Sequence, residues 1–170
     1  MSTTSTPSRF TAAFRAHPAG VALVTADAGA GPVALTATSV ASVSADPPML
    51  MFSVSDASSS SPTVAAADTV VVHLLAAEQL HLAKLGATSG IDRFADASLW
   101  ERMPTGEVCF RDAHTRIRAR VVERLRVGTS SVMVVEALDI EGFGTDSGST
   151  APLVYHDRGW HSLGDHSRIE

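Results

Sequence analysis

Hydroxyl-bearing side chains are concentrated between residues 36 and 61, and their types and spacing suit hydrogen bonding to a polar ligand. Thr36, Thr38, Ser42 and Ser44 occupy even positions, whereas the odd positions from Val33 to Val43 are mostly small or apolar. A period of two predicts a half-buried strand with one face in the core. The other face is then a row of hydroxyl groups.

A second group of hydroxyls follows a predicted turn. Asp46-Pro47-Pro48 ends the first strand because proline has no N–H to donate, and residues 49–55 alternate as a second strand. Ser58 to Ser61 then precede Pro62, which begins a short helix through Ala67. Free N–H groups at a helix start, with hydroxyls beside them, favour phosphate binding. The alternative is an ordinary solvated sheet face followed by a capped loop.

The remainder of the chain predicts many short strands and few helices. Thr6 and Pro7 begin a helix through Ala16, with Phe10 and Phe14 on its buried face. Another helix is expected over residues 78–85, ended by Gly86, before a long irregular excursion over 86–106. Further strands are expected at 20–26, 70–75, 116–127, 131–138 and 153–156, with a Gly/Ser/Thr loop over 142–150.

The strand over 116–127 carries arginine at alternating positions. Arg116, Arg118, Arg120, Arg124 and Arg126 are interleaved with apolar residues, which predicts a solvated or partner-facing row of cations. Nucleic acid is not expected as a partner, because the net charge of the chain is −5.

The composition indicates one globular domain. The chain has 170 residues, of which 45% are hydrophobic and 18% charged. We expect a disordered tail over 1–7, a single domain over 8–164 and a polar tail over 165–170. Cys109, the only cysteine, is expected to be a packed core thiol. Without a signal-like start or an apolar run of about 20 residues, we expect no membrane association and a cytoplasmic location.

Other chemistries lack their motifs. The seven histidines form no His-x-x-x-His pair on a predicted helix, so no metal site is predicted. The chain has no Gly-x-Gly-x-x-Gly after a strand, no Gly-Lys-Ser and no Gly-x-Ser-x-Gly. A Rossmann site, a P-loop and a serine nucleophile are therefore not indicated.

Five ordered segments resemble the flavin reductase-like domain family, the FMN-binding split barrel. LTATSVASVSADPPMLMFSVS resembles that family's T-x-x-S-x-x-S-V-S-x-D-P-P-L segment, and the serines after it resemble its S-x-x-S-x-T element. The other matches are residues 17–25, residues 72–83, Asp92-Arg93-Phe94, and Pro152 to Tyr155 with Gly159. The resemblance covers roughly residues 9–163.

The resemblance implies a mainly β fold with a few short helices, a split β-barrel of Greek-key type. It also implies a bound flavin, FMN or alternatively FAD, with the isoalloxazine and ribityl chain near residues 32–39 and the phosphate near residues 53–60. Lys84 is the cation it favours for the phosphate, although an ordinary exposed helix lysine would look the same. The expected cofactor-binding residues are Pro32, Val33, Ala34, Leu35, Thr36, Thr38, Ser39, Ser53, Val54, Ser55, Ser59, Ser60, Lys84 and Leu85.

The function implied is that of an NAD(P)H-dependent flavin reductase. NADH or NADPH would reduce the flavin, a homodimer would form, and a flavin-dependent monooxygenase would receive the reduced flavin. Members of the family commonly carry Gly-Asp-His where this chain has Gly128-Thr129-Ser130, and asparagine where it has His73. No catalytic residue is assigned beyond Ser130 and His156 near the nicotinamide subsite.

Two alternatives stay open. Ser130 in place of histidine favours a flavin carrier or partner protein on the same fold, which binds the cofactor without efficient turnover. An oxidase of the pyridoxamine-phosphate type shares the barrel, but its arginine-rich motif is not evident in residues 156–170.

Overall fold

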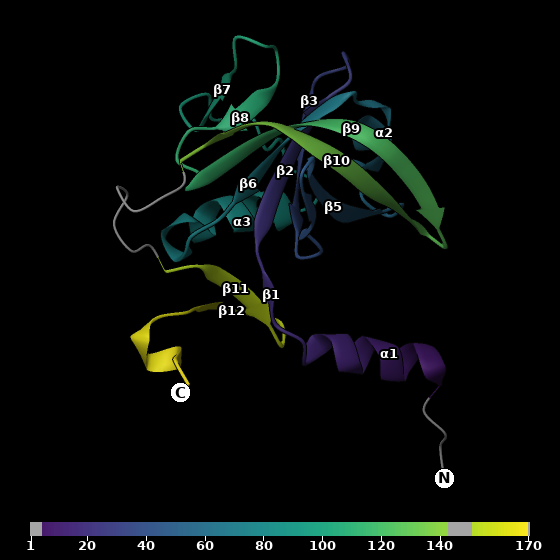
Figure 1. Ribbon diagram of the computed structural model, residues 1–170, viewed down its shortest axis with the longest axis vertical. Helices are drawn as coiled ribbons and strands as arrows, with labels where there is room; N and C mark the ends of the chain where they lie inside the picture. Colours follow the sequence, from purple (N-terminus) through teal and green to yellow (C-terminus); the bar gives the residue numbers. More distant parts are fainter. Residues whose placement is uncertain (1–4, 143–150, 170) are drawn as a thin grey trace.

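The computed structural model describes residues 5–142 and 151–169, and one antiparallel seven-stranded sheet dominates it (Figure 1). The order across this sheet is β3 (Pro32–Ala37), β2 (Ala22–Asp27), β6 (Thr69–Leu74), β9 (Thr115–Val127), β10 (Ser130–Glu141), β5 (Pro48–Ser55), β4 (Ala41–Ala45). A three-stranded sheet has the order β1 (Ala19–Gly20), β11 (Leu153–His156), β12 (Gly159–Ser162). A two-stranded sheet pairs β7 (Trp100–Arg102) with β8 (Val108–Phe110). The helices are α1 (Thr6–Arg15), α2 (Ser61–Ala66) and α3 (Leu80–Ala87), with 3₁₀ turns at Ala77–Gln79 and Asp165–Ser167.

The link between β3 and β4 forces the sheet to curl. These are the two edge strands, yet only residues 38–40 separate them. Four extended steps from Ala37 to Ala41 span at most about 14 Å, so the two edges must lie close together. No backbone ladder joins those edges within the described residues. The result is a barrel with a split, which confirms the predicted split β-barrel.

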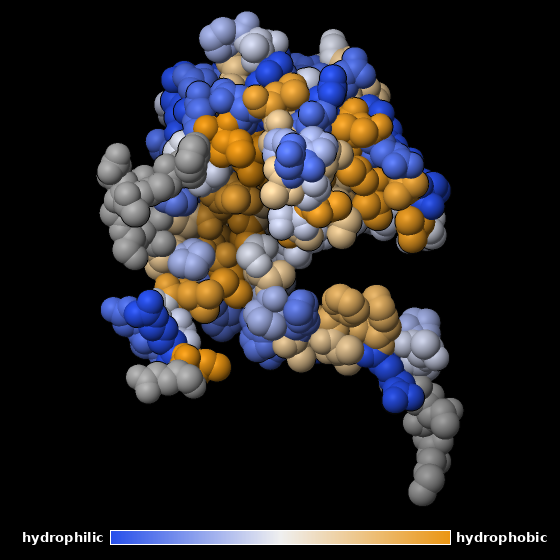
Figure 2. Space-filling view, in the orientation of Figure 1, coloured by the Kyte–Doolittle hydropathy of each residue, from blue (hydrophilic) through white to orange (hydrophobic). Residues whose placement is uncertain are grey.

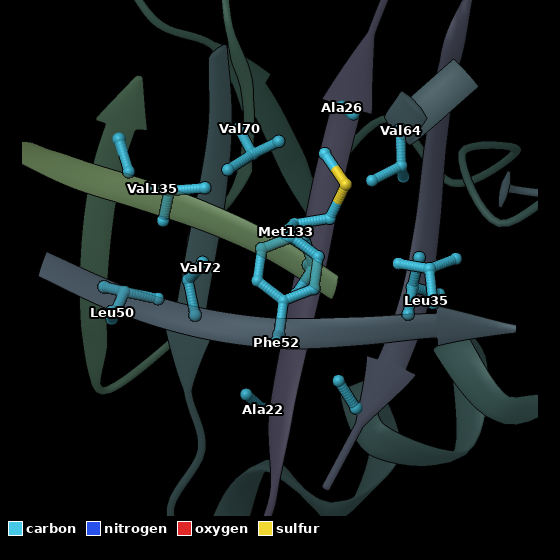
Figure 3. Close-up of a cluster of buried hydrophobic side chains, with 14 of the residues drawn as sticks. Ala22, Ala26, Leu35, Leu50, Phe52, Val64, Val70, Val72, Met133 and Val135 are labelled. Carbon is cyan, nitrogen blue, oxygen red and sulfur yellow. The ribbon is translucent and has the colours of Figure 1, made fainter. Parts of the chain in front are cut away.

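The barrel interior is filled by apolar side chains from six strands of the main sheet, β2, β3, β5, β6, β9 and β10, and from α2. Phe52 and Met133 lie at its centre, with Val72 and Leu50 packed around them (Figure 3). These side chains are at most 7% exposed. The alternation that predicted β5 is confirmed, because Leu50, Phe52 and Val54 point inward while Met51 and Ser53 point outward.

A second apolar cluster lies outside the barrel wall. Leu23, Leu82, Phe110 and Leu153 pack there, between β2, α3, β8 and β11. Strand β2 is therefore buried on both faces.

The single strand predicted over residues 33–44 is wrong. The chain leaves one edge of the sheet at Ala37 and enters the other edge at Ala41, so the alternation does not carry across the link. Ala34 is fully buried because the second apolar cluster covers the outer face of β3, whereas Val43 is 56% exposed.

Two predicted helices differ from the structure. Helix α1 spans the expected residues, but Phe10 and Phe14 are 63% and 61% exposed because the helix projects away from the barrel (Figure 1). Helix α3 continues through Gly86 to Ala87 instead of ending at the glycine. A Cβ on Gly86 would lie 2.2 Å from Leu23 Cδ1, so glycine serves close packing there.

The arginine row does not stay on one face of β9. A β-bulge opposite Val134 and Val135 shifts the register, after which Arg124 and Arg126 are on the opposite face from Arg120. Arg116, Arg118, Arg120 and Arg126 form salt bridges with carboxylates, so the row is not simply solvated. Cys109 is buried, as expected.

His73 joins three strands inside the second apolar cluster. Its Nε2 accepts the N–H of Phe110 at 3.0 Å, so the proton is on Nδ1, which donates to the carbonyl of Leu23 at 2.9 Å. The side chain is fully buried, and this desolvation lowers the pKa of His73 from 6.5 to about 4. The folded protein therefore holds His73 as the neutral imidazole.

The free energy of unfolding should fall as His73 is forced to bind a proton. The unfolded chain binds that proton below pH 6.5 and the folded protein only near pH 4, so this contribution is complete above pH 6.5 and lost by about pH 4. Urea unfolding should show His73→Asn losing about 3 kcal/mol less than the parent between pH 7 and 4. Equal losses would show that His73 does not carry the pH dependence.

Candidate functional site

A cleft of about 710 Å³ lies at the split of the barrel. Its walls come from β3, the 38–39 link, β5, the turn before α2 and the segment after α3. None of the described residues that line it is acidic, and Arg93 is the one charged side chain among them. The lining residues are Leu35, Thr36, Ala37, Thr38, Ser39, Ser53, Val54, Ser55, Ala57, Ser58, Ser59, Gly86, Ala87, Ser89, Gly90, Arg93 and Ser130.

The turn over residues 55–60, here called the serine loop, is held by its own hydrogen bonds. Ser55 Oγ accepts the N–H of Ala57, and Ser58 Oγ accepts the N–H of Ser60. The N–H of Ser61 donates to the carbonyl of Ser58, and Pro62 has none, so the start of α2 offers fewer free donors than the sequence predicts. Ser59 is the exception, since neither its N–H nor its hydroxyl has a partner in the described structure.

The β9–β10 hairpin anchors the serine loop. The N–H of Asp56 donates to the carbonyl of Thr129 at 3.0 Å. Both carboxylate oxygens of Asp56 accept from Arg126, at 2.8 and 2.5 Å, in a bidentate pair. Because the bulge in β9 turns Arg126 toward this side of the sheet, the hairpin that carries Ser130 is fixed beside the loop.

Hydrogen bonds fix the other two walls. Ser39 Oγ accepts the N–H of Ser53 at 2.9 Å, which attaches the link to β5 across the split. Thr36 Oγ1 donates to the carbonyl of Ala83 at 2.7 Å, which attaches β3 to α3. The absence of a side chain at Gly86 permits this close approach of helix and strand. The cleft therefore has rigid walls on three sides.

Several polar groups inside these walls are left without a protein partner. The hydroxyls of Thr38, Ser53, Ser59, Ser89 and Ser130 make no hydrogen bond within the described structure. Arg93 Nη2 donates to the carbonyl of Thr88 at 2.7 Å, but its Nε is buried and unpaired. A buried unpaired donor is unusual in a folded protein and indicates a missing acceptor. Together these groups fit an anionic, hydroxyl-rich ligand.

The structure brings together eight of the predicted cofactor-binding residues and Ser130. Leu35, Thr36, Thr38, Ser39, Ser53, Val54, Ser55 and Ser59 line the cleft. The other predicted positions lie elsewhere. Val33 and Ala34 belong to the apolar clusters, Pro32 pairs with Asp27 in the β2–β3 hairpin, and Leu85 packs in the second cluster.

Ser60 and Lys84 also lie outside the cleft lining. Ser60 is 1% exposed and its hydroxyl donates to the carbonyl of Ala34 at 3.0 Å. Lys84 is on the exposed side of α3. Sequence reasoning did not single out Arg93, the charged side chain among the described lining residues, although the Asp92-Arg93-Phe94 motif was the signal that could have identified it.

His156 lies in a second cleft, apart from Ser130. That cleft is lined by α1, the 38–41 segment and the β11–β12 hairpin. Within residues 5–142 and 151–169, no group of three His, Cys, Asp or Glu side chains is arranged to hold a metal ion. In the same residues, no helix has the length and apolar character required to cross a membrane.

A split barrel with a cleft of hydroxyl groups and one arginine at its split is typical of a ligand-binding β-barrel protein, and comparison with known proteins gives the family. The model of the flavin reductase like domain matches residues 14–164. The chain therefore belongs to the flavin reductase-like domain family, as its motifs indicated.

The relatives include enzymes and solved structures. The chain is 40% identical over 148 residues to the NADH:FMN oxidoreductase of Rhodococcus erythropolis, which covers 87% of this chain and 77% of that protein. A flavin reductase domain protein from Arthrobacter sp. FB24 superposes with a TM-score of 0.84 at 33% identity, covering 92% of this chain and 94% of the other. BorF, the flavin reductase component of a bacterial two-component tryptophan halogenase, gives a TM-score of 0.80 at 27% identity, covering 92% and 98%.

The two adjacent serines should respond differently to removal of the hydroxyl. Ser60→Ala removes a buried hydrogen bond to Ala34 and should lower the free energy of unfolding by about 1 kcal/mol. Ser59→Ala removes an exposed, unpartnered hydroxyl and should leave the free energy of unfolding unchanged. Urea titration of both variants measures this, and equal stabilities would contradict the assigned roles.

Proposed function

We propose that this protein is an NAD(P)H-dependent flavin reductase that transfers hydride from the nicotinamide to FMN, or alternatively to FAD. The observation that carries the proposal is the cleft at the split, where unpartnered hydroxyls and the orphaned Arg93 Nε occur together in a chain 40% identical to an NADH:FMN oxidoreductase. A cytoplasmic location belongs to this proposal.

Different residues of the cleft would bind different parts of the flavin. Arg93 and the serine loop would hold the phosphate, since a guanidinium and hydroxyls are donors suited to phosphate oxygens. Thr38, Ser39 and Ser53 would face the ribityl chain and ring edge. The flavin supplies the hydride-accepting chemistry when bound, and the protein supplies position and polarity. Because the task is to bring two rings together, no acid–base pair is required in the cleft.

Nicotinamide oxidation tests the proposal directly. The purified protein is mixed with NADH or NADPH and catalytic FMN or FAD, and the absorbance of the reduced nicotinamide is followed. Rapid loss of absorbance with at least one pair supports the reductase and identifies both preferences. A flat trace with all four pairs overturns it.

A flavin carrier is the second candidate function. Ser130 favours it, because this cleft residue is a hydroxyl where members of the family commonly have an imidazole. Tight flavin binding without nicotinamide oxidation would support the carrier. For the reductase, we propose a flavin-dependent monooxygenase as the recipient of reduced flavin, in keeping with BorF, a component of a two-component system.

Replacing Arg93 should weaken binding of the flavin phosphate and leave binding of the isoalloxazine ring unchanged. Arg93→Met should weaken FMN binding by about tenfold to a hundredfold, because a charge-assisted hydrogen bond contributes about 1.5 to 3 kcal/mol. Riboflavin, which lacks the phosphate, should bind both proteins equally. Fluorescence titration measures both ligands, and Lys84→Met serves as the matched control that leaves both affinities unchanged. An equal loss for FMN and riboflavin would mean that Arg93 only supports the fold.

We also infer that the protein works as a homodimer. The outer face of β5, β9 and β10 presents Met51, Leu125 and Val127, which are 39%, 44% and 57% exposed. Val132 and Val134 lie between them, since the register pairs Met51 with Val134 and Leu125 with Val132. An apolar sheet face of this kind suits a partner surface.

Light scattering tests the dimer. The mass should be twice the 17.7 kDa of the chain, and Met51→Glu should reduce it to one copy by placing a charge on the apolar face. Leu163→Glu, at a 45% exposed residue away from this face, is the control that should keep the dimer mass. A parent protein of single-chain mass would exclude the dimer.

A further inference from the structure

The serine loop is anchored at both of its ends, and the two anchors reach different strands. At the far end, the hydroxyl of Ser60 donates to the carbonyl of Ala34 on β3 at 3.0 Å. At the near end, the ladder between β5 and β10 stops at the pair of Ser55 and Ser130, so the loop begins where regular strand pairing ends. Asp56, the next residue along the chain, supplies the near anchor.

Asp56 is bound to the β9–β10 hairpin by three hydrogen bonds. Its N–H donates to the carbonyl of Thr129 at 3.0 Å, and its two carboxylate oxygens accept from Nη1 and Nη2 of Arg126 at 2.8 and 2.5 Å. Nε of Arg126 donates to the carbonyl of Gly128 at 3.2 Å, which holds the guanidinium on the hairpin turn. All three guanidinium nitrogens are therefore engaged, and a planar fork of this kind fixes the orientation of the carboxylate as well as its distance.

Ser59 lies between the two anchors and carries the free donors of the loop. Every other N–H group from Asp56 to Ser61 has an acceptor within the described residues, whereas the N–H and the hydroxyl of Ser59 have none. A loop that is fixed at both ends presents these two donors in one place, which reduces the entropy lost when a ligand binds. A loop that is fixed only at Ser60 does not.

The charge of Asp56 opposes an anion in the cleft. Ser55 and Ala57, the residues on either side of Asp56, both line the cleft. A carboxylate at this position repels a phosphate, so electrostatics alone favour a neutral residue there. The favourable contribution of Asp56 to phosphate binding must then come from the way it holds the loop.

The ion pair of Asp56 and Arg126 lies at the surface. The side chain of Arg126 is 66% exposed and that of Asp56 is 35% exposed. Figure 2 shows the end of the β9–β10 hairpin at the right of the view, where hydrophilic residues lie beside hydrophobic ones. Exposed ion pairs contribute little to the free energy of unfolding, because water and salt screen them. Bidentate geometry at such a site is suited to orienting the loop and not to stabilising the barrel.

We propose that the Asp56–Arg126 ion pair positions the serine loop for the phosphate of the flavin. Neither residue is among those that line the cleft, so both are positioning residues that act through Ser59. The proposal rests on the proposed flavin reductase function, because it assigns these residues a role toward the same ligand. The pair then determines how far the protein prefers FMN to riboflavin, which lacks the phosphate.

Breaking the pair should weaken binding of FMN and leave binding of riboflavin unchanged. Fluorescence titration of Arg126→Met and of Asp56→Ala should show a loss of about tenfold for FMN, because the two donors of Ser59 are no longer held in place. Asp56→Ala gives the sharper test, since it also removes a negative charge and would bind FMN more tightly if the charge alone mattered. Tighter or unchanged binding of FMN to Asp56→Ala overturns the proposal, and so does an equal loss for FMN and riboflavin.

The double variant tests whether the two residues act as one unit. Because both substitutions break the same pair, Asp56→Ala with Arg126→Met should bind FMN about as weakly as either single variant. A loss equal to the product of the two single losses would contradict the proposal.

Arg120→Met is the matched control on the same strand. It breaks the salt bridge to Glu136 on β10, its side chain is 59% exposed, and it lies outside the cleft lining. It should bind FMN and riboflavin like the parent protein. A loss of FMN binding in this control would show that any ion pair of the hairpin has the same effect, which overturns the specific role of Asp56 and Arg126.

Kinetics separate this proposal from the proposed function. With NADH in excess, Arg126→Met should raise KM for FMN about tenfold and leave kcat unchanged, as expected when binding alone is weakened. A lower kcat with unchanged KM overturns the positioning role. If the parent binds FMN but oxidises neither NADH nor NADPH, the reductase function fails while the titrations still decide on the pair. A parent protein that does not bind FMN overturns both.

Discussion

The three-residue link between β3 and β4 is the constraint on which the rest of this structure depends. It ties the two edges of a seven-stranded sheet within about 14 Å of each other, so the sheet must close into a barrel apart from one split. At the split no backbone ladder joins β3 to β4 within the described residues, and side chains of β3, the 38–39 link and β5 line one cleft. A fully closed ladder would fill that space with backbone hydrogen bonds.

The walls of the split are rigid while the groups inside it are unpaired. Thr36, Ser39 and the Asp56–Arg126 pair each bond one wall to a neighbouring element. By contrast, Ser59 and the Nε of Arg93 lack partners in the described structure. This division suits the proposed flavin site, because the cost of ordering the walls is met during folding and the unpaired donors would gain a partner when the ligand binds.

The charged side chains also differ between the cleft and the rest of the barrel. The chain has a net charge of −5, yet the described residues that line the cleft include Arg93 and no carboxylate. Most arginines of β9 are neutralised by nearby glutamates and aspartates. Salt bridges therefore neutralise most arginines of β9, whereas Arg93 at the cleft has no carboxylate partner in the described structure.

The sequence by itself determined the features that depend on local pattern. Alternation and apolar runs located the strands, prolines and glycines located most turns, and five ordered motifs identified the family. Eight of the predicted cofactor-binding positions line one cleft, because the hydroxyl row and the serine run are close in the chain and fold together. Only the tertiary structure decided where neighbouring residues go. Residues 33–44 belong to both edge strands of the main sheet, β3 and β4. The bulge in β9 turns Arg126 toward the serine loop. Helix α1 does not pack against the barrel, so its phenylalanines are exposed. Arg93 and not Lys84 reaches the cleft for the same reason, since long-range packing and register, which no local period encodes, set the direction of each side chain.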